Sequence, residues 1–448
     1  MTYHLGLISI FLLAGLRSIH GQADSGALYF PSESKAVQNE NLPLMPAPAI
    51  VPQYNSAPLQ YQSFVNQLIS VAIANVTLSI NRLMPPRSRS NENLVFSPIS
   101  ITAALALVLL GSNGETFNEI SRVLGLQAGI SDIDYRSQFF HERFSDLLDK
   151  LVATAGFQLG HDVRVANALF VQDTYPIREL YKNVANALYE ASVVNVDFQN
   201  DPTNAGNVIN EWVARSTRGK IRQLLAADPP RETTVILSSA LYFMAEWERP
   251  FFEHSTKRRP FYPDGRKSPT DIEVDMMANG GLFPYFRDRR LGCEILGFPY
   301  KGNRSTMYVV MPVNSSKDNL ERILSTLTID DLEQLVSHTV LTEVITVFPK
   351  MIIESTIDLE DTLKQMGIKS LFNPRESNLA LLGDIKLTYG NAVTNFTKNI
   401  KNYDVNSIDT IRQLINQQSR DNSYLNPGLY ADQVIHKVYV DINEKGTE

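Results

Sequence analysis

The spacing of apolar residues predicts helices and strands along most of the chain from residue 60 onward. Between residues 64 and 80 apolar side chains recur at steps of three and four, the period of an amphipathic helix. The run 101–110 is apolar on every side, so we expect a fully buried helix there. Ser97 as N-cap, Pro98 at the first helical position and Gly111 as the C-terminal stop agree with these limits.

A second helix start is predicted shortly after this helix. Thr116 and Glu119 have the spacing of a capping box, and the apolar residues Ile120 and Val123 follow. Gly125 is then expected to end a short helix.

Strand patterns alternate with these helices. Residues 234–244 form a continuous apolar run, which is typical of a central strand buried on both faces. The β-rich runs 305–311 and 339–348 are bounded by Pro312 and Pro349. Because helices and strands mix without a regular strand–helix–strand rhythm, we expect an α+β fold in one large domain, residues 59–448.

Two segments depart from the pattern of the predicted domain. Residues 24–58 carry six prolines without apolar periodicity, which predicts a disordered extension. Residues 384–428 are rich in asparagine and hold a single helical candidate, 407–415, so we interpret them as an inserted surface excursion.

The first 23 residues are interpreted as a signal peptide. The apolar run 5–16 is too short to span a bilayer, and the small residues Gly21 and Ala23 suit cleavage. We therefore expect a secreted, extracellular protein, with an uncleaved anchor as the alternative because no Lys or Arg precedes the run. No other segment is expected to cross a membrane.

Composition narrows the classes of function. A formal charge of -7 without a run of Lys or Arg argues against nucleic acid and anionic membranes as partners. The single cysteine, Cys293, excludes an intrachain disulfide and lies in an apolar run, where we expect an inert buried thiol; an intermolecular disulfide is the alternative. Because the histidines are scattered and no hydrolase, phosphate-loop or zinc motif is present, we expect neither an enzyme nor a cofactor.

Four Asn-x-Ser/Thr sequons are candidate glycosylation sites. Asn303 and Asn314 are predicted to lie in loops, whereas the first lies within a helical pattern and the last within the asparagine-rich segment. The four residues are Asn75, Asn303, Asn314 and Asn395.

Several motifs, in the order in which they occur, resemble the serpins, the serine-protease-inhibitor superfamily. The resemblance covers residues 60–448 apart from the asparagine-rich segment. The motifs are Phe96-Ser-Pro-Ile-Ser100, Asn210-Glu-Trp-Val213, Thr217-x-Gly-Lys-Ile221, Ala240-Leu-Tyr-Phe-x-x-x-Trp247, Phe348-Pro-Lys350 and His436-Lys437 through Glu444-x-Gly-Thr-Glu448.

The resemblance implies three functional regions around a mixed central sheet called sheet A. A cleaved reactive loop would insert into that sheet as an extra strand, carrying the attached protease with it. The implied hinge of the loop is Glu444, Gly446, Thr447 and Glu448. The implied shutter, through which the sheet opens, is Ser97, Ser100, Ser239 and His436. The implied breach at the top of the sheet is Trp247, Lys350 and Glu444.

The alternation of residues in the last strand agrees with this resemblance. Val434, His436 and Val438 alternate with more polar residues, so His436 is predicted on the apolar face. Gly446 and the small, β-favouring Thr447 suit a segment that converts from loop to strand. Ser239 departs from the family, which usually has Asn there, and this departure falls within the shutter's hydrogen-bond network.

The resemblance implies suicide inhibition of a secreted serine protease by a monomer. In residues 131–154, where some relatives bind glycosaminoglycans, basic and acidic residues are mixed, so no strong heparin binding is expected. A non-inhibitory carrier, chaperone or storage protein is the alternative. By resemblance the reactive loop and the final strands would follow Glu448, so an inactive truncated product also stays open; the reactive bond and the target protease are not given by this sequence.

Overall fold

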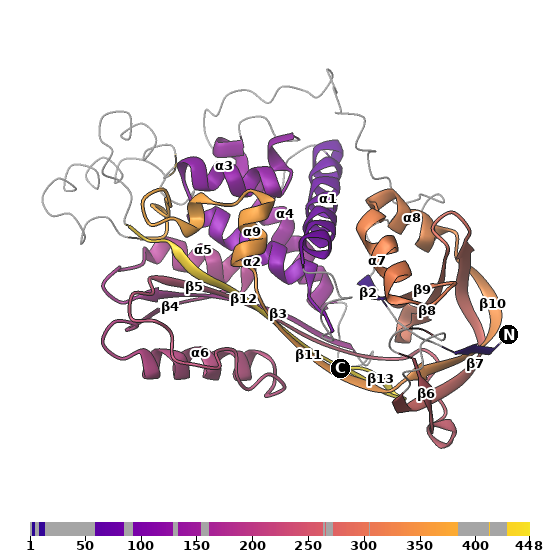
Figure 1. Cartoon of the computed structure of the whole chain (residues 1–448). Helices are drawn as coiled ribbons and strands as arrows, with labels where there is room; N and C mark the ends of the chain where they lie inside the picture. Colours follow the sequence, from indigo (N-terminus) through magenta and orange to yellow (C-terminus); the bar gives the residue numbers. More distant parts are fainter. Residues whose placement is uncertain are drawn as a thin grey trace, which may run out of the picture.

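The computed structural model describes residues 2–4, 9–13, 59–84, 93–128, 133–153, 161–262, 265, 272–303, 305–383, 412 and 428–448. These residues form two β-sheets with helices packed against both, which confirms the predicted α+β fold (Figure 1). The segment 24–58, the sequon at Asn395 and the helical candidate 407–415, except for Arg412, lie outside the described residues.

The six-stranded sheet runs in the order β11-β12-β13-β5-β3-β4. Its central strand β5 is buried along most of its length, as the apolar run 234–244 predicted. The strands are β3 (His161–Gln172), β4 (Ser192–Val196), β5 (Val235–Glu246), β11 (Met351–Asp358), β12 (Ala431–Ile442) and β13 (Gly446–Thr447).

This sheet is forked at one end. Strands β12 and β5 pair directly and in parallel from Ala431 opposite Val235 to Val438 opposite Leu241. Beyond that point the short strand β13 lies between them and pairs antiparallel with both. The chain therefore turns back after β12 and enters the sheet as an additional strand.

Most helices cover one face of the forked sheet, and α6 covers the other (Figure 1). Ile209 and Val213 of α6 belong to one buried cluster with Ile236 of β5 and Ile435 of β12, and α6 contacts β3 and β5. The helices of this region are α1 (Leu59–Leu83), α2 (Pro98–Gly111), α3 (Gly114–Val123), α4 (Ile133–Ala153), α5 (Glu179–Tyr189), α6 (Pro202–Ser216) and α9 (Glu360–Met366).

Helix α2 has the predicted bounds and the predicted N-cap. Ser97 Oγ accepts the backbone N–H of Ser100 at 3.3 Å, and every residue from Ser100 to Gly111 is buried. Gly111 has a different role from the one expected. It is the last helical residue, and a Cβ there would lie 2.9 Å from the ring of Tyr181, so glycine is needed for close packing rather than for a left-handed stop.

The predicted capping box at Thr116 and Glu119 is wrong, because α3 begins before Thr116 and both side chains lie inside the helix. Glu119 Oε2 instead accepts the backbone N–H groups of Lys369 and Ser370, each at 2.8 Å. The Ser370 hydroxyl donates to Glu119 Oε2 at 2.7 Å and lies 3.0 Å from Thr116 Oγ1. The spacing of Thr116 and Glu119 therefore reflects a tertiary contact with the turn after α9. Such a contact uses the same residue types as a capping box.

The second sheet runs β1-β10-β7-β8-β9-β2, with β6 paired to β7. Cys293 of β8 is fully buried, and burial raises the pKa of its thiol to about 12, so it is inert as expected. The elements are β1 (Thr2–His4), β2 (Ser9–Leu13), β6 (Lys257–Phe261), β7 (Ile272–Asp288), β8 (Cys293–Pro299), β9 (Thr306–Pro312), β10 (Val340–Pro349), α7 (Lys317–Thr326) and α8 (Ile329–Ser337).

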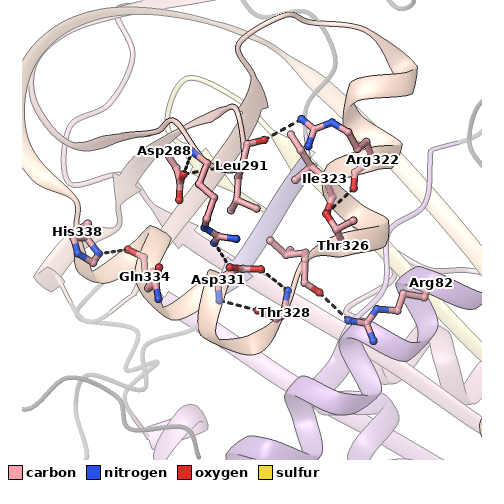
Figure 2. A network of polar contacts seen from close by, with 12 residues as sticks. Arg82, Asp288, Leu291, Arg322, Ile323, Thr326, Thr328, Asp331, Gln334 and His338 are labelled. Carbon is pink, nitrogen blue, oxygen red and sulfur yellow. Dashed lines mark hydrogen bonds and ion pairs between the residues drawn. The ribbon is translucent and has the colours of Figure 1, made fainter. Parts of the chain in front are cut away.

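Asp331 joins helix α8 to the turn between β7 and β8 (Figure 2). It forms a capping box with Thr328, in which Thr328 Oγ1 accepts the N–H of Asp331 and Asp331 Oδ2 accepts the N–H of Thr328. Its other oxygen pairs with Arg290. Burial would raise the pKa of Asp331, but the bonds from Thr328 and Arg290 outweigh it and lower that pKa.

Two further arginines complete this contact (Figure 2). Arg322 of α7 donates to the carbonyl of Leu291 at 3.0 Å, and Arg82 of α1 donates to the carbonyl of Leu327 at 3.0 Å. The bond from Arg82 connects α1, among the helices of the first sheet, with the segment between α7 and α8 of the second.

Helix α1 corrects one expectation about membranes. By length and composition alone its segment Phe64–Leu83 could span a bilayer. In the structure Val65, Ile69, Val76 and Ile80 are buried in the core that α1 shares with α2 and α4. Packing within the domain therefore accounts for its apolar residues.

Candidate functional site

The predicted hinge lies in the fork of the six-stranded sheet. Gly446 and Thr447 form β13, with Thr447 opposite Ala245 of β5 on one side and Ile442 of β12 on the other. The backbone N–H of Glu448 donates to the carbonyl of Asp441 at 2.7 Å. The hinge residues are thus paired as a strand on both edges.

Gly446 is the residue at which this pairing allows no side chain. A Cβ at this position would lie 2.1 Å from the carbonyl oxygen of Ala245, and backbone cannot yield as a flexible side chain can. Close backbone approach therefore requires glycine here.

Thr447 is buried and hydrogen-bonded. Its side chain is 2% exposed, and the hydroxyl of Tyr300 donates to Thr447 Oγ1 at 2.9 Å. Burial raises the pKa of Tyr300, so the phenol keeps the proton that it donates. Tyr300 also stacks on Trp247 with ring centroids 4.7 Å apart.

Glu448 is held from two sides. Tyr242 of β5 donates its hydroxyl to Glu448 Oε1 at 3.0 Å, and Lys220 Nζ lies 2.9 Å from Glu448 Oε2. Burial and the bond to Glu448 raise the pKa of Tyr242 to about 12. The hydrogen bond to Glu448 also raises the pKa of Lys220. Each oxygen of this carboxylate therefore has a donor.

The three predicted breach residues come together above the fork. Lys350 Nζ lies 2.8 Å from Glu444 Oε2, and the hydroxyl of Thr256 donates to Glu444 Oε1 at 2.8 Å. Trp247 donates its indole N–H to the carbonyl of Asn443 at 2.9 Å, in the turn between β12 and β13.

The pKa shifts agree with this ion pair. The hydrogen bond from its ammonium group to Glu444 raises the pKa of Lys350. Burial would raise the pKa of Glu444, but the bonds from Lys350 and Thr256 lower it. Both groups are therefore charged at neutral pH.

The four predicted shutter residues also meet. The backbone N–H of Ser97 donates to His436 Nε2 at 2.8 Å, so this nitrogen carries no proton. His436 Nδ1 then carries the proton and lies 3.3 Å from Ser239 Oγ. Ser100 joins through its hydroxyl, 2.7 Å from that of Ser97. Complete burial lowers the pKa of His436 to about 3, so the imidazole is neutral.

Asn167 is a shutter neighbour that the sequence reasoning missed. It lies on β3 opposite Ser239, which in turn lies opposite His436 on β12, so three polar residues cross three strands in register. The Asn167 side chain is buried, and neither end of its amide has a hydrogen-bond partner. The feature of the sequence that could have indicated this residue is an asparagine within an apolar run of strand β3.

The remaining predicted sites fall as follows. Asn314 is exposed in a loop and Asn303 is exposed at the end of the short 3-10 helix Lys301–Asn303, whereas Asn75 is half-buried in the middle of α1. Their glycosylation stays a prediction. On α4, Arg143 pairs with Asp146 at 2.7 Å. Within the described part of the chain, no cluster of three or more His, Cys, Asp or Glu residues could hold a metal ion.

Comparison with known proteins identifies the class to which this forked α+β fold belongs. The family model for serpins, serine protease inhibitors, matches residues 72–448. The chain therefore belongs to the serpin family. A curated relative, serine protease inhibitor 28Dc of Drosophila melanogaster, is 31% identical over 420 residues, which cover 88% of this chain and 74% of the relative.

Solved structures agree on the fold. Ovalbumin from emu (Dromaius novaehollandiae) superposes with a TM-score of 0.68 at 23% identity, covering 85% of this chain and 87% of the other. Serpin48 of Tenebrio molitor, titled a highly specific serpin, gives 0.64 at 22% identity, covering 87% and 89%. The family is one of protease inhibitors rather than enzymes.

Proposed function

We propose that this serpin inhibits a serine protease by taking the cleaved reactive loop into the six-stranded sheet. The observation that carries the proposal is the hinge: Gly446 and Thr447 already pair between β5 and β12, where an additional strand must begin. The ion pair of Lys350 with Glu444 and the contacts of His436 supply the breach and the shutter.

The test is an incubation of the full-length protein with trypsin-like and chymotrypsin-like proteases. A trapped protease gives a complex that survives SDS, because the attached protease is joined by an ester bond. Rapid cleavage of the loop by every protease, with no such complex, would reject the proposal and favour the non-inhibitory alternative.

We further propose that the protein is secreted and acts as a monomer. The apolar run 5–16 followed by Gly21 and Ala23 supports secretion. Protein recovered from the culture medium should begin between residues 22 and 24 by N-terminal sequencing and should elute at the mass of one chain. An N-terminus at residue 1 in the membrane fraction would reject secretion.

Weak binding to heparin belongs to the same proposal. Arg143 is already paired with Asp146, and acidic residues are interspersed along α4. We expect elution from heparin resin at low salt, and retention at high salt would contradict this.

A further inference from the structure

The turn after α6 carries two cations that reach across the fork. Arg218 Nη2 pairs with Asp162 Oδ2 at 2.6 Å, and its guanidinium lies 5.7 Å from the ring centroid of Tyr242. Asp162 belongs to β3 and Tyr242 to β5, so Arg218 is fixed to the strands on one side of the fork.

Lys220 contacts the other side of the fork. Its ammonium pairs with Glu448 at 2.9 Å and lies 5.7 Å from the ring centroid of Tyr439 in β12. Tyr242 closes the chain of contacts by donating to the same carboxylate. Side chains of the turn and the sheet thus connect β3, β5, the hinge and β12.

The turn itself is held rigidly. The Thr217 hydroxyl donates to the carbonyl of Val213 at 2.8 Å and accepts the backbone N–H of Ile221 at 3.0 Å. Arg218 and Gly219 both have left-handed backbone, with φ of 53° and 78°, and Ile221 is buried. The two cations are therefore presented from a fixed backbone.

We propose that this turn positions the hinge, with Lys220 as the residue that receives Glu448 and Arg218 as the anchor of the turn on β3. The inference rests on the proposed function and adds residues to it. A charged residue near the start of an entering strand would oppose insertion if it had no partner. Here Lys220 is held in a fixed position beside the fork and pairs with Glu448, so insertion begins from a hinge that is already bound to the sheet.

The experiment compares Lys220→Met with Lys220→Arg, which keeps the charge, and with Glu448→Gln. Lys182→Met is the matched control, because Lys182 forms an exposed ion pair with Glu179 on α5, away from the fork. Hydrogen exchange of residues 444–448 is measured in the unreacted protein. The second readout is the number of inhibitor molecules consumed for each protease trapped.

We expect exchange in residues 444–448 to become about two- to fivefold faster in Lys220→Met and in Glu448→Gln, with recovery in Lys220→Arg. We also expect Lys220→Met to consume more inhibitor for each trapped protease at an unchanged rate of loop cleavage. A merely structural role would not change this ratio. If Lys220→Met does not fold, Glu448→Gln decides alone.

Unchanged exchange in both charge-removing variants would overturn the inference, as would additive effects in the double variant Lys220→Met, Glu448→Gln. A parent protein that traps no protease would instead reject the proposed function. The exchange measurement would still decide whether Lys220 seats the hinge, so the two failures are distinguishable.

Discussion

At the scale of single residues, the hinge depends on a glycine without a side chain, and the shutter depends on a histidine without a charge. Gly446 has no side chain because the carbonyl of Ala245 lies where a Cβ would be. His436 has no charge because it is completely buried and Ser97 donates to its Nε2. A substitution at Gly446 would add the missing side chain, and acid would add the missing charge to His436.

Replacing Gly446 with alanine should expel β13 from the fork. The new Cβ would collide with backbone, so we expect exchange of residues 444–448 to approach that of an unpaired segment while the helices keep their protection. Gly280→Ala is the control. Gly280 also lies in a strand, but the nearest atoms to an added Cβ would be 3.9 Å away, which is ordinary van der Waals contact. Equal protection in Gly446→Ala and the parent would contradict the close approach.

Acid should destabilise the protein through His436 and His141. Burial lowers the pKa of each to about 3, with Arg412 adding to the effect at His141. Between pH 6.5 and 3 the unfolded chain binds protons that the folded chain excludes, so stability is retained above pH 6.5 and lost as the pH falls. Each histidine contributes about 1.4 kcal/mol per pH unit in this window.

Calorimetric melting between pH 4.5 and 7.5 measures this dependence. Unfolding of the variant His436→Gln should take up about one proton fewer than unfolding of the parent protein. The variant His254→Gln replaces an exposed histidine and serves as the control for the substitution itself. An uptake in His436→Gln equal to that of the parent would show that this histidine is not the neutral group described.

At the scale of elements, the short helix α8 depends on one carboxylate. Asp331 closes the capping box with Thr328 and also pairs with Arg290. Helices of this length need tertiary contacts and caps to persist. The contact with the turn between β7 and β8 therefore determines where α8 begins.

Substituting Asp331 should cost more stability than substituting its neighbour. We expect Asp331→Ala to lower the free energy of unfolding by about 1–3 kcal/mol, because it removes one half of the capping box and the ion pair with Arg290, and leaves the N–H of Thr328 without its acceptor. Asp330→Ala removes another acid from the same first turn and should cost only a few tenths of a kcal/mol. Urea denaturation of both variants checks this, and similar losses would contradict the role of the capping box.

Elements with a strong internal pattern could be predicted, whereas contacts between distant elements could not. The limits of α2 and the burial of β5 follow from runs of apolar residues and from Ser97 and Pro98. Thr116 and Glu119 misled because a cap and a contact with the turn after α9 use the same residue types. The shutter and breach residues could be named only through the family resemblance, and the partners Tyr300, Thr256 and Lys220 emerge only from the fold.

At the scale of the whole molecule, the Lys350–Glu444 pair joins the two sheets at the top of the fork. Lys350 lies between β10 and β11, at the passage from one sheet to the other, and Glu444 lies in the turn that leads into β13. Exposure keeps the energy of such a pair small, so its effect should be on the path of the hinge rather than on global stability.

Reversing the charge as Glu444→Lys should promote misinsertion and polymers, because two cations would then face each other at the entry to the fork. Native gels and size exclusion after mild heating measure the polymer fraction. The double variant Lys350→Glu, Glu444→Lys restores the opposite charges and should return the fraction toward that of the parent. A monomeric single variant with unchanged melting would remove the role of this pair.

The fork also determines the order of events in time. The last direct pair between β5 and β12 is Leu241 with Val438, and the next two pairs below it are Ala240 with Lys437 and Ser239 with His436. In the proposed mechanism a strand that grows from β13 separates these pairs one after another, each by about 4.8 Å. The His436 contact is therefore an early barrier, and arrested intermediates should stop just above it rather than at random positions along the sheet.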